Sequence, residues 1–182
     1  MNGAVLANLH LPWILAVILA LVAGLGDLRT RRIPNRLTVS ALLAGLAVNG
    51  ILGGWRGMVF SLEGAALGLG ILLPVVLLRG LGAGDWKLMG ALGAMVGPKE
   101  TFLIVFVTVL MAAGWGVVEM IRQRRTKSTL ANLWELMQGF AVFGLRPNAK
   151  ITIEAQPLIK LPFGAVTAVA TAVTLSAAWL KW

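Results

Sequence analysis

The sequence predicts an all-α, polytopic membrane protein with about six transmembrane helices. Hydrophobic residues make up 58% of the 182 positions, charged residues make up 13%, and the mean hydropathy is +0.86. A soluble domain carries about 25% charged residues, so this balance indicates that lipid is the solvent. Cysteine is absent, and the one histidine, His10, precedes the first apolar stretch. The composition therefore argues against disulfide frameworks, thiol nucleophiles, histidine metal centres and Ser-His-Asp triads.

The apolar stretches have the length of bilayer-crossing helices, which take about 20 residues each. Five of them lie at 11–27, 37–54, 58–79, 101–121 and 162–180. A shorter stretch at about 86–97 begins directly after Gly84-Asp85, and hydropathy alone does not decide whether it spans. No basic segment precedes the first stretch and no clear cleavage site follows it, so we expect a retained span and not a signal peptide.

The positions of the 16 lysine and arginine residues decide whether the short stretch is a sixth span. With six spans, nearly all of them fall on one side of the membrane, and the other side holds only Arg56, Lys99 and Lys181. With five spans this asymmetry disappears, because the basic segment after residue 121 changes sides. The positive-inside rule therefore favours six spans, places the basic side in the cytoplasm and puts both termini outside.

The formal net charge of +9 has the same explanation. The basic residues flank apolar segments and do not alternate with aromatic residues on one soluble face. We therefore expect contacts with anionic lipid headgroups and no nucleic-acid partner.

The loops are mostly short, so we expect one transmembrane domain over residues 1–182. The exception is the cytoplasmic segment 122–160, in which an amphipathic helix at about 129–143 is predicted to lie on the membrane surface. Its apolar residues at helical spacing are Leu130, Leu133, Trp134, Met137 and Phe140. A docking site for a protein partner is the alternative interpretation of this stripe.

The five glutamates have ordinary interpretations, with one exception. Glu119 lies one turn before Arg122, and we expect a local ion pair. Three others, Glu100, Glu135 and Glu154, lie in connections and are expected to be solvated. Glu63 lies five residues into an apolar stretch. It either reaches the outer interface or has a functional role, and the sequence leaves both open.

Asp27 and Asp85 are the only aspartates, and each lies where an apolar stretch meets a basic loop. The six-span topology places both at the same depth, on the cytoplasmic side. Burying such a group is costly, at about 3 kcal/mol for a carboxylate at the membrane centre on insertion scales. One explanation is ion pairing, of Asp27 with Arg31 and of Asp85 with Lys87 or Arg79. Their matched positions favour a second explanation, in which the two carboxyl groups face each other.

Two facing carboxyl groups are the chemical device of an aspartyl protease. They cannot both ionise cheaply, so the pKa of one rises and the pair shares a proton. The ionised member draws a proton from a water that attacks the peptide carbonyl carbon. The protonated member donates to the carbonyl oxygen and later to the leaving nitrogen. This chemistry requires no metal and no cofactor, and we expect neither.

The residues around each aspartate fit a close approach of two helices. Gly82 and Gly84 precede Asp85 and let the backbone bend and a substrate or helix come near. After Asp27, Pro34 disfavours continuation of the first helix, and Asn35 is expected to cap the next one.

Together these motifs resemble the prepilin peptidase family, membrane aspartyl proteases with a Gly-x-Gly-Asp site. The elements that match are Asp27 with Ile33-Pro34-Asn35, then Gly82-Ala83-Gly84-Asp85-Trp86-Lys87-Leu88-Met89, then Leu161-Pro162-Phe163-Gly164. The resemblance runs from about Gly24 to the last helix. It implies that Asp27 and Asp85 are the catalytic pair. It also implies that the substrates are pilin-like precursors with a basic leader and a hydrophobic helix, cut at the cytoplasmic face of the inner membrane.

The resemblance also suggests supporting residues. Lys87 matches the lysine that follows the second aspartate in the family motif, and it either tunes the pair electrostatically or contacts a lipid headgroup. Pro162 and Gly164 either shape the cleft beside the aspartates or start the last helix.

The chain departs from the family's long members in one respect. Those members carry an N-terminal cytoplasmic segment with cysteine pairs, which is associated with N-methylation, whereas this chain has no cysteine and about ten residues before its first span. It resembles the short, peptidase-only type that serves Flp-type pili or archaeal flagellin-like proteins, and methyltransferase activity is not expected. Presenilin-like relatives share the Gly-x-Gly-Asp element, but their Tyr-Asp and Pro-Ala-Leu elements are absent here.

Two other classes of function remain open on the sequence. A small proton-coupled transporter or channel would use the aspartates as a relay, but it prefers acidic residues near mid-membrane, and these lie at segment ends. A non-catalytic assembly factor for a pilus or secretion apparatus would tolerate the loss of both aspartates.

Overall fold

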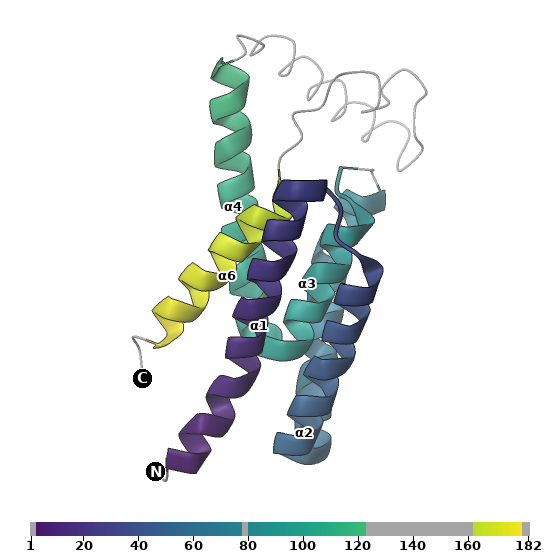
Figure 1. Ribbon diagram of the computed structural model, residues 1–182, viewed down its shortest axis with the longest axis vertical. Coiled ribbons are helices and arrows are strands. Elements are labelled where there is room, and N and C mark those ends of the chain that lie inside the picture. Colours follow the sequence, from purple (N-terminus) through teal and green to yellow (C-terminus); the bar gives the residue numbers. More distant parts are fainter. Residues whose placement is uncertain (1–2, 78–79, 123–161, 180–182) are drawn as a thin grey trace.

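The computed structural model describes residues 3–77, 80–122 and 162–179, and all of its regular elements in these ranges are α-helices (Figure 1). They are α1 (Gly3–Thr30), α2 (Asn35–Leu77), α3 (Ala83–Val96), α4 (Pro98–Arg122) and α6 (Phe163–Trp179). The predicted all-α class is thus confirmed over the described residues. The predicted interfacial helix at about 129–143 lies outside them.

The long helix α2 is two helices that fold back on each other at Gly54. This glycine has φ 59° and ψ −142°, a backbone conformation that breaks the helix and that residues with a side chain rarely adopt. Beyond the bend the two halves pack so closely that a β-carbon on Gly57 would overlap the carbonyl oxygen of Asn49. The two halves match the spans predicted at 37–54 and 58–79. In Figure 1 the chain runs down the first half of α2 and returns along the second.

The short helix α3 packs along the α2 hairpin, and this is the most extensive helix pairing in the described part of the chain. Glycine makes the close approach possible on both sides. A β-carbon on Gly45 would lie 2.9 Å from the carbonyl carbon of Ala94, and β-carbons on Gly64 and Gly93 would each overlap the other's backbone. This packing buries every residue of α3 from Leu88 to Val96.

A buried amide holds the far end of α3. Asn49 Nδ2 donates to the carbonyl oxygens of Ala94 and Met95, at 2.8 and 3.1 Å. Both carbonyls lie in the last turn of α3, where no helical N–H is available to satisfy them. The bond therefore fastens the α2 bend to the C-terminal end of α3.

The second pairing joins α1 to α6, and α6 also packs on α4. A β-carbon on Gly24 would lie 2.9 Å from Ala168 Cβ, so these helices approach each other through small residues. Three alanines of α1, at positions 16, 20 and 23, are buried on the same helix. The described helices thus form two units that lie side by side. The α1–α6 crossing consists of α1 and α6, and the α2–α3 hairpin consists of the two halves of α2 together with α3.

Three helices are long and apolar enough to cross a membrane, in the segments Leu11–Thr30, Asn35–Leu77 and Pro98–Glu119. A shorter apolar helix covers Phe163–Ala178. The length and apolar composition of these helices indicate a membrane protein. The count of six spans and the outside position of both termini remain predictions.

The short helix begins before the apolar stretch at about 86–97. α3 begins at Ala83 with Gly82 as its N-cap. The small residues before the aspartate are compatible with the first helical turn, so the helix extends back over Gly84. Asp85 consequently lies inside the first turn of α3.

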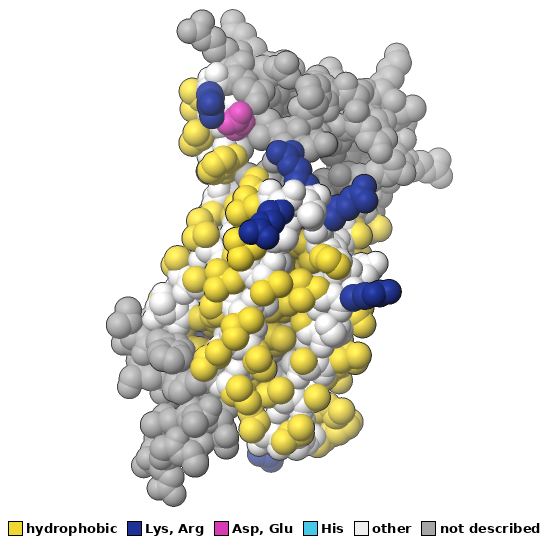
Figure 2. Space-filling view, in the orientation of Figure 1, with side chains coloured by type: hydrophobic (Ala, Val, Ile, Leu, Met, Phe, Trp, Pro, Cys, Tyr) yellow, Lys and Arg dark blue, Asp and Glu magenta, His cyan; other side chains and the backbone are white. Residues whose placement is uncertain are grey.

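The basic side chains gather at one end of the bundle. Figure 2 shows them mostly around the end where α1 ends, with a basic side chain at the opposite end and a largely apolar flank between. Near the same end the predicted ion pair is present, with Arg122 Nη1 3.9 Å from Glu119 Oε2. The charge asymmetry expected from the sequence is therefore visible on this face of the described residues.

Candidate active site

Asp27 lies in the last turn of α1, where the helix is about to end. Arg31 follows with φ 51° and donates its N–H to the carbonyl oxygen of Asp27 at 2.8 Å, which is the left-handed cap of a helix C-terminus. The side chain of Asp27 turns inward and is only 8% exposed. Its Oδ2 accepts a hydrogen bond from the backbone N–H of Gly164 at 2.9 Å.

This hydrogen bond depends on the glycine. A β-carbon on Gly164 would lie 2.9 Å from Asp27 Cβ and 3.2 Å from Oδ2. Pro162 places the donor, because its carbonyl oxygen accepts from the N–H groups of Ala165 and Val166 and so starts α6. Pro162 and Gly164 thus begin the last helix, and Gly164 also contacts Asp27. Their role in shaping a cleft stays a prediction.

Asp85 has different surroundings. It is the third residue of α3, and a β-carbon on Gly82 would lie 3.1 Å from its Oδ2. Its Oδ1 is buried and has no hydrogen-bond partner in the described part of the chain. Asp85 also lies outside the three segments long and apolar enough to cross a membrane. Burial, and after it the charge of Asp27, raises the pKa of Asp85 from 3.8 to about 7.

The two carboxyl groups are therefore close enough to interact, although they lie 58 residues apart in the chain. The effect of Asp27 on the pKa of Asp85 is that of a like charge. The first turn of a helix usually favours an ionised carboxylate, and here burial and the neighbouring carboxylate outweigh that preference. A pair of this kind can hold one proton between two oxygens at neutral pH.

The alternative of ion pairing is not seen among the described residues. Arg31 is exposed, and Asp27 bonds Gly164 instead. Lys87 Nζ donates to Asn35 Oδ1 at 3.0 Å, not to Asp85. Arg79 lies outside the described residues.

The Asn35 prediction was wrong in its detail. Asn35 is already the first residue of α2, and the carbonyl of Pro34 accepts from the N–H groups of Leu37 and Thr38, at 3.0 and 3.4 Å. Pro34 is thus the residue that precedes the helix, and the Asn35 side chain is free to bind Lys87. This bond ties the start of α2 to the first turns of α3.

One contact residue was quoted in the motif but not chosen as a site residue. Ile33 lies between the two aspartate regions: a β-carbon on Gly164 would lie 3.2 Å from its Cδ1, and one on Gly84 would lie 3.2 Å from its Cβ. An isoleucine in a polar connection is the signal that could have found it, because an apolar side chain there needs a partner to bury it.

The structure thus brings together the predicted residues Asp27, Asp85, Gly82, Gly84 and Gly164. Asn35 and Lys87 lie in the first turns of α2 and α3, and Pro34 and Pro162 lie directly before α2 and α6. Glu63 is not among them. It is exposed, next to Gly64, which packs on Gly93 about two turns beyond Asp85. Within the described ranges there is no group of three or more His, Cys, Asp or Glu residues that could hold a metal ion.

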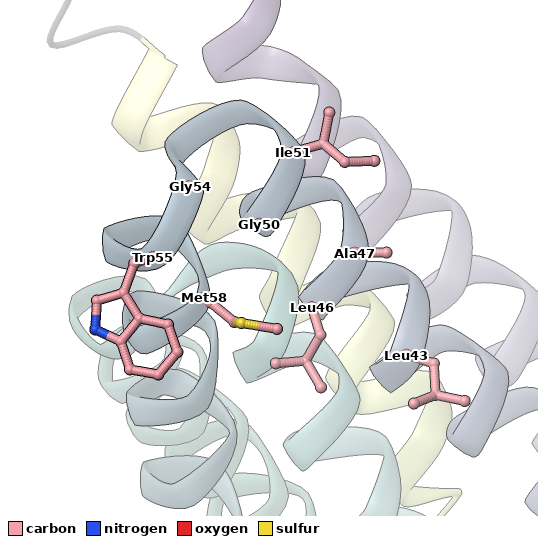
Figure 3. Close-up of a pocket in the computed structure, with 8 residues that line it drawn as sticks. All are labelled: Leu43, Leu46, Ala47, Gly50, Ile51, Gly54, Trp55 and Met58. Atoms are coloured by element: carbon pink, nitrogen blue, oxygen red, sulfur yellow. The ribbon is translucent and has the colours of Figure 1, made fainter.

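An apolar groove lies away from the aspartates, at the bend of α2. Figure 3 shows its lining side chains around Gly54, on both halves of the hairpin. They are Leu43, Leu46, Ala47, Gly50, Ile51, Gly54, Trp55 and Met58. The groove carries no titratable side chain, so it offers surface for apolar chains and no chemistry.

Comparisons with known proteins identify a family and relatives of this chain. Residues 14–117 match the model of the type IV leader peptidase family. The chain is 36% identical to the prepilin leader peptidase/N-methyltransferase of Escherichia coli K12 over 112 residues, which cover 58% of this chain and 49% of that protein. It is 35% identical to the protein of the same name from Burkholderia pseudomallei 1026b over 130 residues, 68% of this chain and 40% of the relative.

The chain thus spans half or less of the length of these relatives. No solved structure matches it. The family match covers more than half of the chain and includes both aspartates, and the chain therefore belongs to the type IV leader peptidase family.

Proposed function

We propose that this protein is an aspartic endopeptidase that removes the leader from pilin-like precursors, with Asp27 and Asp85 as its catalytic residues. The observation that carries this proposal is the position of two carboxyl groups on separate helices. Asp27 is buried, the Oδ1 of Asp85 is buried without a partner among the described residues, and the charge of Asp27 contributes to the raised pKa of Asp85. Membership in the leader peptidase family supports the substrate class, and the relatives are named prepilin leader peptidases.

The two environments suggest a division of labour. Asp27 Oδ2 accepts the Gly164 N–H, whereas Asp85 Oδ1 has no partner among the described residues. Asp85 has a raised pKa of about 7 and so holds a proton near neutral pH. Asp85 is then the general acid, and Asp27 takes the complementary role of general base.

Each bond change can be assigned to these groups. Asp27 removes a proton from a water whose oxygen bonds to the peptide carbonyl carbon, while Asp85 gives its proton to the carbonyl oxygen. In the tetrahedral intermediate the C–N bond then breaks. Asp27 passes its proton to the leaving nitrogen, and Asp85 recovers a proton from the hydroxyl that becomes the new carboxyl group. Both side chains return to their starting states, and one water is consumed.

The cut is proposed to occur at the cytoplasmic face of the inner membrane. The support is the cluster of exposed arginines at positions 29, 31, 32 and 36 beside the end of α1 that carries Asp27. The positive-inside rule places such a cluster in the cytoplasm, and anionic headgroups can bind it. Only the peptidase half of the relatives' name is proposed for this chain.

The proposal is tested by co-expressing the protein with a pilin-like precursor and following leader removal as a mobility shift. Asp27→Asn and Asp85→Asn should each abolish processing while their membrane abundance stays at the wild-type level. Glu63→Gln is the matched control, because it neutralises an exposed carboxylate elsewhere in α2 and should leave processing intact. Normal processing by either aspartate variant would refute the proposal and favour a non-catalytic role.

A further inference from the structure

The two aspartates belong to different packing units. Asp27 is carried by α1, which pairs with α6, and Asp85 is carried by α3, which pairs with α2. The contacts of α1 with α2 and with α3 are each fewer than the contacts within either unit. The separation of the carboxyl groups therefore depends on what lies between the units at the level of the aspartates.

The connection from α1 to α2 supplies one apolar side chain at this level, Ile33. It is half-buried and packs against the core. Toward α6, its Cδ1 lies 3.2 Å from the position that a β-carbon on Gly164 would occupy. Toward α3, its Cβ and carbonyl oxygen lie 3.2 and 3.3 Å from the position of a β-carbon on Gly84.

These two glycines are the immediate neighbours of the carboxyl groups. Gly164 donates its N–H to Asp27, and Gly84 directly precedes Asp85. Ile33 thus contacts both backbones that position the pair, and glycine on each side leaves no intervening side chain to absorb a change. Protein interiors of this kind transmit volume changes of even one methylene group.

We propose that Ile33 is a positioning residue whose side-chain volume sets the separation of the Asp27 and Asp85 carboxyl groups. This proposal rests on the proposed function, since it concerns the same pair. In this proposal Ile33 does not contact the substrate or either carboxyl group. It sets the position of the carboxyl groups through its contacts with Gly164 and Gly84.

The consequence is electrostatic and can be measured. For charges about 4 Å apart at an effective dielectric constant of about 20, each ångström of separation changes the pKa of a carboxyl group by about half a unit. Asp27 is the charged group that acts on Asp85. Lys87 on the same helix is bound to Asn35, Arg36 at the start of α2 is exposed, and the described part of α6 carries no charged residue.

The test is a volume series at Ile33 with the high-pH limit of cleavage as the readout. Ile33→Val deletes only Cδ1, the atom that faces Gly164, and keeps the Cβ branch that faces Gly84. The units should close slightly, and the pH at which half of the activity is lost should rise by about 0.5. Ile33→Phe should separate them and lower the same midpoint. Titration of the protonated carboxyl band in the infrared gives this midpoint without substrate.

Ile104→Val is the matched control, because it deletes the same atom from a fully buried isoleucine of α4. It should keep the wild-type midpoint even if stability falls equally. A midpoint order of Val above wild type above Phe supports the proposal, and any other order overturns it. Failure of the proposed function looks different: Asp27→Asn or Asp85→Asn would then still cleave the precursor, whatever the Ile33 variants do.

Discussion

The α1–α6 crossing and the α2–α3 hairpin each contribute one aspartate, but they treat it in opposite ways. At the crossing, Asp27 is buried and its Oδ2 accepts a backbone N–H. At the hairpin, Asp85 has a buried Oδ1 without a partner among the described residues, and its pKa is raised to about 7. The two carboxyl groups thus differ in their surroundings, because α6 supplies a hydrogen-bond donor to Asp27 and no described helix supplies one to Asp85 Oδ1.

The two units also differ in what holds them together. The hairpin relies on interlocking glycines and on the buried Asn49 amide, which lie at the end of α3 remote from Asp85. The crossing places its closest contact, Gly164, directly on Asp27. In the hairpin, the residues that pack the helices together are therefore distant from the aspartate, whereas at the crossing the residue in closest contact also binds the aspartate. Substitutions in the two units should have different consequences.

The largest expected effect is on cleavage, when either carboxyl group is removed. Asp27→Asn and Asp85→Asn should each lower kcat by about 10³-fold, since each removes a general acid or base. Their stabilities should differ. Asp27→Asn changes the acceptor of the Gly164 N–H and should lower the thermal midpoint, whereas Asp85→Asn changes a side chain whose buried Oδ1 has no partner among the described residues and should not. Equal thermal midpoints would erase the distinction between the two units.

The next effect comes from crowding the crossing. Gly164→Ala places a methyl group 2.9 Å from Asp27 Cβ and should lower kcat by about 10²-fold, because the carboxyl group is displaced from its bonded position. Gly45→Ala crowds the hairpin to the same 2.9 Å, against Ala94. It should lower stability with little effect on the kcat of the folded fraction. If both variants lose kcat equally, packing and chemistry are not separated as described.

The pH dependence of stability and of cleavage is expected to come from Asp85 in the hairpin. The native state holds the Asp85 proton up to a pKa of about 7, whereas the unfolded chain releases it near 3.8. The unfolded state binds fewer protons between these values, so the free energy of unfolding should fall as pH rises from about 4 to about 7. Cleavage should fall above about pH 7, as the general acid is lost. Chemical denaturation across this range checks the first trend, and Asp85→Asn should flatten it.

The smallest effects separate buried from exposed hydrogen bonds within the hairpin. Asn49→Ala removes the donor to the Met95 carbonyl and one of the two donors to the Ala94 carbonyl, which Ser61 Oγ also serves. It should cost about 1–3 kcal/mol of stability. Lys87→Met breaks the exposed bond to Asn35 and should cost about 1 kcal/mol or less. Thermal unfolding in detergent compares the two. A larger loss for Lys87→Met would show that the connection, not the far end of α3, fastens the hairpin.

Local patterns in the sequence determined the all-α class, the apolar helices and the choice of both aspartates. Apolar length and charge placement express the same constraint that acts on the chain, namely that a bilayer requires satisfied backbones and excludes charge. Glycines before Asp85 and a proline after Asp27 likewise act on their own neighbours. Each of these signals could be recognised without knowing which helices meet.

The tertiary structure decided everything that depends on partners far apart in the chain. Asn35 binds Lys87 instead of capping α2, Gly164 reaches Asp27 across 137 positions, and Ile33 lies between two glycines of different helices. No local pattern encodes these meetings, because they follow from how closely the helices approach. The difference between the two aspartates arises in the same way. Composition identified the pair, and helix packing brought a donor to one carboxyl group and only burial to the other.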